Sequence, residues 1–95
     1  MLFIAYFKPK PGASTTGDFT EKNRRWWNEG ERPEGLRTVA MYGALGTEAP
    51  DVYVFETERA QDIHKLIAYW REVDFDIHPA VDLIEVYRQQ GMSVE

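Results

Sequence analysis

The chain begins with an apolar run that has no polar side. Residues 2–8 read LFIAYFK, so aliphatic and aromatic side chains would occupy both sides of an extended segment. A run of this length and composition predicts a strand that is covered on both faces. The Pro-, Gly- and Ser/Thr-rich residues 9–17 that follow predict a loop.

Residues 18–29 have helical periodicity, and their two adjacent tryptophans cannot face the same way. Phe19, Asn23 and Trp26 recur at intervals of three and four, so they form one stripe along a helix. Consecutive helical side chains point about 100° apart, which places Trp27 on the shoulder of this stripe. The pattern predicts Trp26 as a core anchor. It leaves Trp27 as a pocket wall, a subunit contact or a contact of the C-terminal tail.

A hairpin and a second helix are predicted next. Residues 36–46 and 51–58 have strand composition, and residues 46–50 (GTEAP) predict the turn of an antiparallel hairpin between them. Residues 59–73 carry apolar side chains at positions i, i+3, i+4 and i+7, which is typical of an amphipathic helix. The apolar positions are Ile63, Leu66, Ile67 and Trp70.

The remaining residues predict one more strand and a short final helix. Residues 74–78 (DFDIH) alternate polar and apolar side chains, and Pro79 restricts this strand to an edge or a bulge. Residues 82–91 predict a helix that is capped by Asp82, with Glu85 as a capping-box partner, and that stops at Gly91.

The element order is therefore β, α, β, β, α, β and a short C-terminal helix. It predicts an α+β protein of the ferredoxin-like type, with an antiparallel sheet in a single domain of residues 1–95. Such a sheet carries its helices on one face only, yet two of its strands are apolar on both faces. We therefore expect a homodimer in which two sheets pack face to face, which is a dimeric α+β barrel.

Composition and charge exclude several classes of partner. The chain has 11 basic and 16 acidic residues and no basic stripe, so we expect no nucleic-acid partner. There is no cysteine, hence no disulfide framework and no thiol nucleophile. The first apolar run is too short for a membrane span and lacks the positive flank of a signal peptide. We expect a soluble, cytoplasmic protein with no membrane partner.

Several short motifs occur in a characteristic order. They are a Pro-x-Gly-hydrophobic entry to the second strand, an aromatic–acidic end to the third strand, and a Trp followed by a Phe-acidic-x-x-Pro-x-Val segment. The positions are Pro33, Gly35, Leu36, Phe55, Glu56, Trp70, Phe75, Asp76, Pro79 and Val81.

This series resembles an uncharacterised family, a domain of unknown function in the dimeric α+β barrel, ferredoxin-like superfamily. His78 and the apolar C-terminal tail depart from the family pattern. The resemblance implies the fold. Proteins of the superfamily include cofactor-free monooxygenases, polyketide cyclases, isomerases, haem-dependent enzymes and stress proteins, so the resemblance leaves the reaction open.

Two groups of side chains are candidates for acid–base or anion-binding chemistry. Residues 74–78 place both acids and His78 on one side of a strand, where Asp76 could orient the imidazole as a general base. The alternative is a hydrated polar edge. His64 and Arg71 share one shoulder of the second helix and could hold an anionic substrate, or they could be half-exposed surface residues.

Asn23 is a polar side chain on an apolar stripe, and it needs a hydrogen-bond partner. A ligand or a backbone group of the second strand could supply it. In cofactor-free monooxygenases of the superfamily that the chain resembles, Asn and Trp side chains line the pocket for an aromatic polyketide, and the likeness here is one of residue type. We therefore expect Asn23, Trp26 and Trp27 to shape a pocket. The phenols of Tyr6 and Tyr42 could point into it or belong to the core or a subunit interface.

These patterns predict a homodimer that binds a small aromatic or polyketide-like molecule. If it is an enzyme, we expect a cofactor-independent isomerase, cyclase, dehydratase or monooxygenase, with His78 or His64 as the base and Asp76 orienting it. The competing function is non-catalytic binding or assembly. The histidines and acids have no recognised metal-ligand spacing, so no metal or other cofactor is expected.

Overall fold

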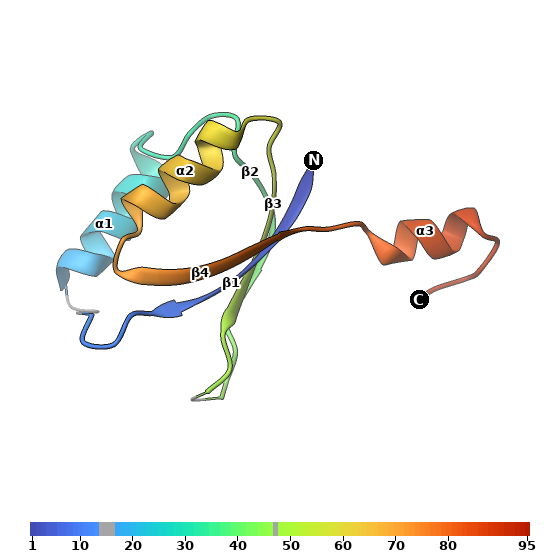
Figure 1. Cartoon of the computed structure of the whole chain (residues 1–95), viewed down its shortest axis with the longest axis horizontal. Helices are drawn as coiled ribbons and strands as arrows, with labels where there is room; N and C mark the ends of the chain where they lie inside the picture. Colours follow the sequence, from blue (N-terminus) through green and yellow to red (C-terminus); the bar gives the residue numbers. More distant parts are fainter. Residues whose placement is uncertain (14–16, 47) are drawn as a thin grey trace.

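The computed structural model describes residues 1–13, 17–46 and 48–95. These residues form a four-stranded sheet with two helices on one face and a third helix that projects from the other side (Figure 1). The elements are β1 (Leu2–Pro9), α1 (Gly17–Asn28), β2 (Arg37–Tyr42), β3 (Asp51–Glu56), α2 (Ala60–Tyr69), β4 (Val73–Pro79) and α3 (Leu83–Gln89).

The sheet has the strand order β2-β3-β1-β4, and all paired strands are antiparallel. This is the order of a ferredoxin-like βαββαβ fold, so the predicted fold class is confirmed. The strand β4, which contains Pro79, lies at an edge as predicted. Part of the predicted loop at residues 9–17 (residues 14–16) and one residue of the predicted turn at 46–50 (Thr47) lie outside the described residues.

Three predicted elements were too long, and the strand predicted for residues 51–58 ends at Glu56. The strand predicted for residues 36–46 ends at Tyr42, because the Ala44 amide donates to the Asp51 carboxylate (2.9 Å) and leaves the strand ladder. The helix predicted for residues 59–73 ends at Tyr69, because Trp70 leaves helical geometry with φ −97° and ψ 52°. Of the apolar positions that predicted this helix, Leu66 and Trp70 are buried, whereas Ile67 is exposed.

The core lies between the helices and one face of the sheet. Alternate residues of the strands point toward the helices, as the period of a strand requires. Trp26 is only 2% exposed, and its ring lies 4.6 Å from that of Tyr69 and 5.9 Å from that of Trp70, measured between centroids. Trp26 is therefore the core anchor that the periodicity predicted. The other buried apolar residues are Ala5, Leu36, Tyr53, Phe55, Leu66, Trp70 and Val73.

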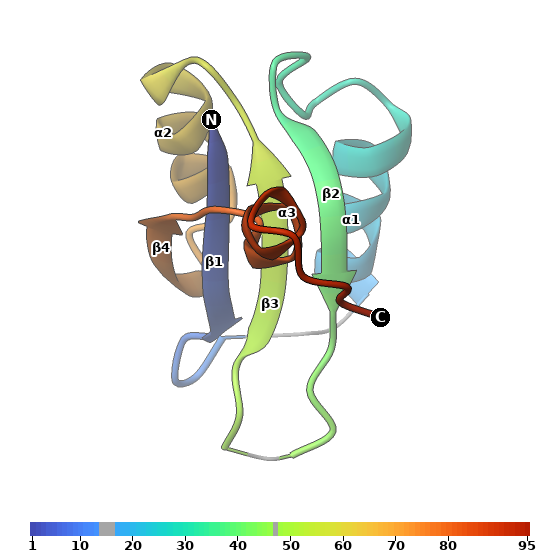
Figure 2. The ribbon, with the colours of Figure 1, turned by 90° about the vertical axis from the view of Figure 1, so that its right-hand side faces the viewer.

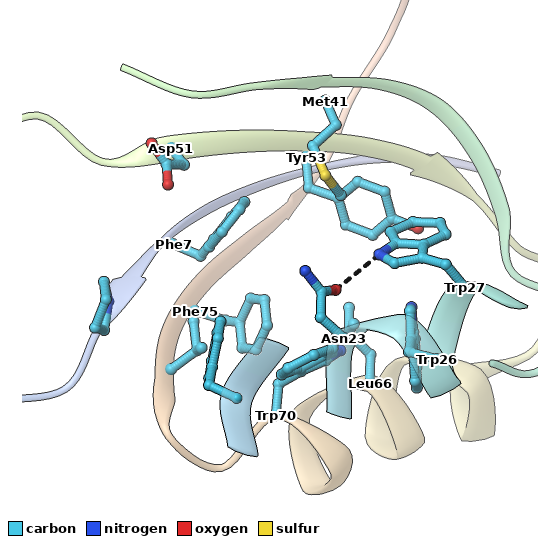
Figure 3. A pocket seen from close by; sticks show the side chains of 13 residues that line it. Phe7, Asn23, Trp26, Trp27, Met41, Asp51, Tyr53, Leu66, Trp70 and Phe75 are labelled. Carbon is cyan, nitrogen blue, oxygen red and sulfur yellow. Dashed lines mark hydrogen bonds between the residues drawn. The ribbon is translucent and has the colours of Figure 1, made fainter. Parts of the chain in front are cut away.

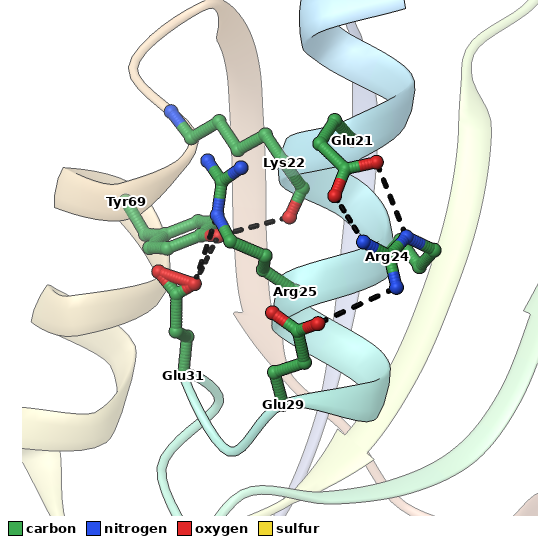
Figure 4. A network of polar contacts seen from close by, with 7 residues as sticks. All are labelled: Glu21, Lys22, Arg24, Arg25, Glu29, Glu31 and Tyr69. Carbon is green, nitrogen blue, oxygen red and sulfur yellow. Dashed lines mark hydrogen bonds and ion pairs between the residues drawn. The ribbon is translucent and has the colours of Figure 1, made fainter.

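Polar contacts join α1 to α2 and to the loop that follows α1 (Figure 4). The Tyr69 hydroxyl at the end of α2 donates to the Lys22 carbonyl (2.9 Å), and the Arg25 Nε donates to a carboxylate oxygen of Glu31 in the loop (3.2 Å). Burial, followed by the charge of Glu31, raises the pKa of Tyr69, so its phenol stays protonated and can donate at neutral pH. These contacts set the direction in which the tryptophan side of α1 faces the sheet.

A partly buried ion pair joins α1 to the start of β4, and it predicts a pH-dependent stability. Lys22 Nζ lies 2.8 and 3.1 Å from the two carboxylate oxygens of Glu72. Partial burial alone would raise the pKa of Glu72, but the hydrogen bonds and charge of Lys22 outweigh it and hold that pKa below its usual range. Its stabilisation is therefore present above the unfolded-state pKa of 4.5 and is lost as the pH falls through the lower folded-state value.

We expect Glu72→Gln to lower the free energy of unfolding by about 1 kcal/mol at pH 7. The difference from the unsubstituted protein should vanish as the solution is acidified below the folded-state pKa of Glu72. The protonated Glu72 is then as uncharged as the glutamine that replaces it. Urea denaturation at a series of pH values measures this. The exposed Glu34→Gln is the control and should change little at any pH. A Glu72→Gln effect that stays constant from pH 7 to strong acid would contradict the prediction.

On the second face of the sheet, no helix of the described residues is packed (Figure 2). Its apolar residues alternate with the core residues along β1, β2 and β3, and neighbouring strands are in register there, with Val54 opposite Ile4 on one side and Ala40 on the other. We call this surface the open face. Its apolar residues are Leu2, Ile4, Tyr6, Ala40, Tyr42, Val52 and Val54.

The final helix forms where the sequence predicted one, but it does not pack on the sheet. Asp82 is its N-cap, and the Asp82 carboxylate accepts from the Glu85 amide (3.2 Å). Gly91 ends it with a φ of +85°, a conformation that favours glycine. Figures 1 and 2 together show α3 standing away from the sheet on the side of the open face.

Candidate ligand-binding cavity

A cavity of about 290 Å³ lies between the helices and the sheet (Figure 3). Its size is at the lower end of small-molecule sites, which span roughly 300–1,000 Å³. The lining residues are Phe7, Pro9, Phe19, Asn23, Trp26, Trp27, Met41, Asp51, Tyr53, Leu66, Trp70, Val73 and Phe75. Every strand and both core helices contribute to it, so the whole fold fixes its shape.

Asn23 and Trp27 form a hydrogen-bonded pair on the cavity side of α1. The indole Nε1 of Trp27 donates to the Asn23 Oδ1 at 2.9 Å, one helical turn away. The sequence suggested a strand backbone or a ligand as a partner of this amide, and the Trp27 indole is the partner of its oxygen. With its oxygen occupied, Asn23 presents its NH₂ group toward the cavity (Figure 3).

Trp27 is a wall of this cavity. Its side chain is 37% exposed, its ring is edge-on to Tyr53 with 6.3 Å between centroids, and the Arg32 guanidinium lies 5.4 Å from its centroid. The Tyr53 hydroxyl is 2.9 Å from the Thr38 hydroxyl. Burial raises the pKa of Tyr53, against the opposing effects of Thr38 and Arg32, so its phenol is neutral at pH 7.

Asp51 brings a carboxylate to the edge of a lining that is mostly aromatic and aliphatic. One of its oxygens accepts from the Ala44 amide, and within residues 1–13, 17–46 and 48–95 the other has no hydrogen-bond partner. Sequence reasoning did not select Asp51, or Phe7 and Phe75 from the neighbouring strands. The strand register was the missing signal, since Phe7 lies opposite both Asp51 and Phe75 on the core side of the sheet.

The residues predicted for acid–base chemistry lie elsewhere. His78 Nε2 and Asp76 Oδ1 are 2.6 Å apart, so the expected neighbours do pair. They do so beside the open face, on the side of the sheet opposite the cavity, where the two side chains are 56% and 70% exposed. Neither residue lines the cavity described above, and their catalytic role stays a prediction.

Some of the other predicted site residues line the cavity and some do not. His64 and Arg71 are exposed on or just beyond α2 and do not line the cavity. Tyr6 and Tyr42 belong to the open face. Of the predicted binding residues, the fold brings together Asn23, Trp26 and Trp27.

Two further findings concern cofactors and membranes. In the described part of the chain, no three His, Asp or Glu side chains gather closely enough to hold a metal ion. No helix there is both long enough and apolar enough to cross a bilayer.

The fold and the cavity define an α+β protein with a ferredoxin-like sheet and a ligand-sized space beneath its helices. Residues 1–90 match the family described as Domain of unknown function (DUF3303), and the chain belongs to this family. No curated protein and no solved structure matches the chain.

Proposed function

We propose that the cavity binds a small, flat aromatic molecule that carries a carbonyl oxygen. The observation behind this is the Asn23 amide, whose oxygen is engaged by Trp27 and whose NH₂ group faces an aromatic space. Flat rings would stack on or meet the edges of the lining rings, and a carbonyl would accept from Asn23. The aromatic lining residues are Phe7, Phe19, Trp26, Trp27, Tyr53, Trp70 and Phe75.

The same arrangement supports a cofactor-free reaction of the isomerase or cyclase type. The Asn23 NH₂ group would stabilise the negative charge that develops on a carbonyl oxygen when a proton is removed from the adjacent carbon. Asp51 is the carboxylate of the lining and would accept that proton. We place the base at Asp51 rather than His78 because His78 lies across the sheet from the cavity. A monooxygenase reaction would begin from the same enolate.

The assembly that we propose is a homodimer of the dimeric α+β barrel type. Two copies would bring their open faces together, which would remove the apolar side chains of β1, β2 and β3 from water. The support is the open face itself, on which Tyr42 and Tyr6 remain exposed in the single chain.

Intrinsic fluorescence tests the binding proposal, because all three tryptophans of the chain line the cavity. The probes are 1-tetralone, which has an aromatic ring and a carbonyl, and tetralin, which lacks only the carbonyl oxygen. We expect both to change the fluorescence. Asn23→Leu should weaken 1-tetralone binding by about tenfold, the worth of one hydrogen bond, and leave tetralin binding unchanged.

Asn28→Leu is the matched control, since it makes the same replacement on the same helix at a residue outside the lining. It should leave the binding of both probes unchanged. Failure of either probe to alter the fluorescence, or an equal loss of both in Asn23→Leu, would contradict the proposed contact.

Exchange of the α-hydrogens of 1-tetralone for deuterium, followed by NMR, separates catalysis from binding. An enzyme of the proposed kind should accelerate the exchange, and Asp51→Asn should abolish the acceleration while the ketone still binds. Binding without any acceleration would favour the alternative function, a non-catalytic binding domain.

A further inference from the structure

The C-terminal arm, residues 81–95, contains the well-defined helix α3, which packs on no other element of the residues that the structure describes. At the end of α3, the Gly91 amide donates to the Arg88 carbonyl (3.0 Å) and the Met92 amide donates to the Tyr87 carbonyl (3.0 Å). This pair of bonds is the Schellman motif, and Asp82 caps the opposite end. The sequence thus specifies where α3 begins and where it ends.

The helix is amphipathic, and its apolar side is uncovered. Glu85, Arg88 and Gln89 share one side, and none of the residues of α3 is buried. A helix of this length does not persist in water without tertiary contacts. Contact with a second surface would stabilise it. The exposed apolar residues of the arm are Val81, Leu83, Ile84, Tyr87 and Met92.

The arm points in the direction from which a second copy would reach the open face. The Ala80 amide still donates to the Leu2 carbonyl (2.9 Å), so the chain stays on the sheet to that residue. Beyond it the arm leaves on the side of the open face and extends away from the sheet (Figures 1 and 2). A second copy approaching the open face meets α3.

Each of the two surfaces also carries a charge that a second copy could pair. The β4 side of the open face carries Asp74, and the polar side of α3 carries Arg88. Within the described residues, neither side chain makes an ion pair in its own chain. A second copy can supply the opposite charge to both.

We propose that the C-terminal arms are exchanged between two copies, with the apolar side of each α3 packed at the rim of the open face of the other copy, beside the contact between the two sheets. This inference rests on the homodimer proposed above and names the segment that holds it together. It concerns the side of the sheet opposite the cavity, so ligand binding can be tested separately.

Because the chain has no cysteine, single cysteines can report the contact. Ala40→Cys places a thiol on the open face, and Gln90→Cys places one at the end of α3. A mixture of the two variants, treated with a short bismaleimide, should give a product with one chain of each kind. No such product would overturn the exchange. An intramolecular link in the double variant at high dilution would also overturn it, since the arm would then cover its own sheet.

Sedimentation of the full chain at several concentrations gives the energetic test. We expect Tyr87→Glu to raise the dimer dissociation constant by about 30-fold, as for a central interface residue. The control, Gln89→Glu, adds the same charge to the polar side of α3 and should leave the constant nearly unchanged. Both variants should keep the helical signal of the folded protein and bind 1-tetralone normally, because α3 takes no part in the core or the cavity.

The possible outcomes separate the two proposals. A dimer that Tyr87→Glu does not weaken would overturn the arm exchange and leave the face-to-face dimer standing. A protein that is monomeric at all concentrations would overturn both. Neither result bears on the ligand proposed for the cavity.

Discussion

Replacing Trp26 with alanine should lower the free energy of unfolding by about 3–5 kcal/mol, whereas Trp27→Ala should lower it by about 1 kcal/mol. Trp26 is almost fully buried and packs on Tyr69 and Trp70, so its removal leaves a large hole between the helices and the sheet. Trp27→Ala removes the ring contact with Tyr53 and the hydrogen bond to Asn23. The space that it leaves is open to solvent, so water can fill it.

Urea denaturation followed by far-ultraviolet circular dichroism checks this pair, because the signal does not depend on the tryptophan that is removed. Trp26→Phe should recover part of the loss, since a ring still fills much of the space. Equal destabilisation by Trp26→Ala and Trp27→Ala would contradict the assignment of Trp26 to the core and Trp27 to the cavity wall.

The second large effect is expected at Gly35, where there is no room for a side chain. A Cβ built at this position would lie 2.5 Å from the Asp62 Oδ2. Asp62 is only 2% exposed, and its carboxylate accepts a hydrogen bond from the Thr57 hydroxyl (2.7 Å), so it cannot move aside without losing that bond. We expect Gly35→Ala to destabilise the protein by about 3 kcal/mol, at the upper end for overpacking.

A double-mutant cycle identifies the cause. In an Asp62→Ala background, Gly35→Ala should have less than about one third of its original effect, because the atom that it meets is gone. Gly43→Ala is the matched control, since a Cβ there would lie 3.8 Å from its nearest neighbour, which is ordinary contact. An undiminished Gly35→Ala effect in the Asp62→Ala background would place its origin in the backbone instead.

The contact at Gly35 also explains part of the motif that pointed to the family. Leu36, the hydrophobic residue of the Pro-x-Gly-hydrophobic motif, is fully buried, and its amide donates to the Pro33 carbonyl (3.1 Å). The glycine lets this turn lie against the buried carboxylate at the start of α2. The motif is therefore a packing feature of the fold and does not by itself indicate a reaction.

The periodicity of the sequence was sufficient to predict the order of the elements. It also predicted that Trp26 lies in the core and that Trp27 lies beside it on the helix. These are local properties, since the direction of a side chain along a helix or a strand follows from spacing alone. The ends of β2 and α2 were not predictable in this way. β2 ends where the Ala44 amide donates to the Asp51 carboxylate, and α2 ends at the change of backbone conformation at Trp70. Neither feature alters the spacing of apolar residues, so the periodicity does not reveal it.

The candidate site was predictable only where it lies on one helix. Asn23 and Trp27 meet because they are four residues apart, but Asp51 joins them through the pairing of distant strands. For His78, the alternation of residues 74–78 correctly grouped the imidazole with Asp76. Alternation shows which residues share a face, but it does not show which face the helices cover.

That alternation has a consequence for how the protein can vary. Along β1, β3 and β4, odd-numbered residues such as Phe7, Tyr53 and Phe75 face the helices, and even-numbered residues such as Tyr6 and Val52 face away. A substitution at an odd position alters the space for a ligand, and one at an even position alters the opposite surface. Within one short sheet, lineages could change what is bound and what is assembled one residue at a time, each with little effect on the other.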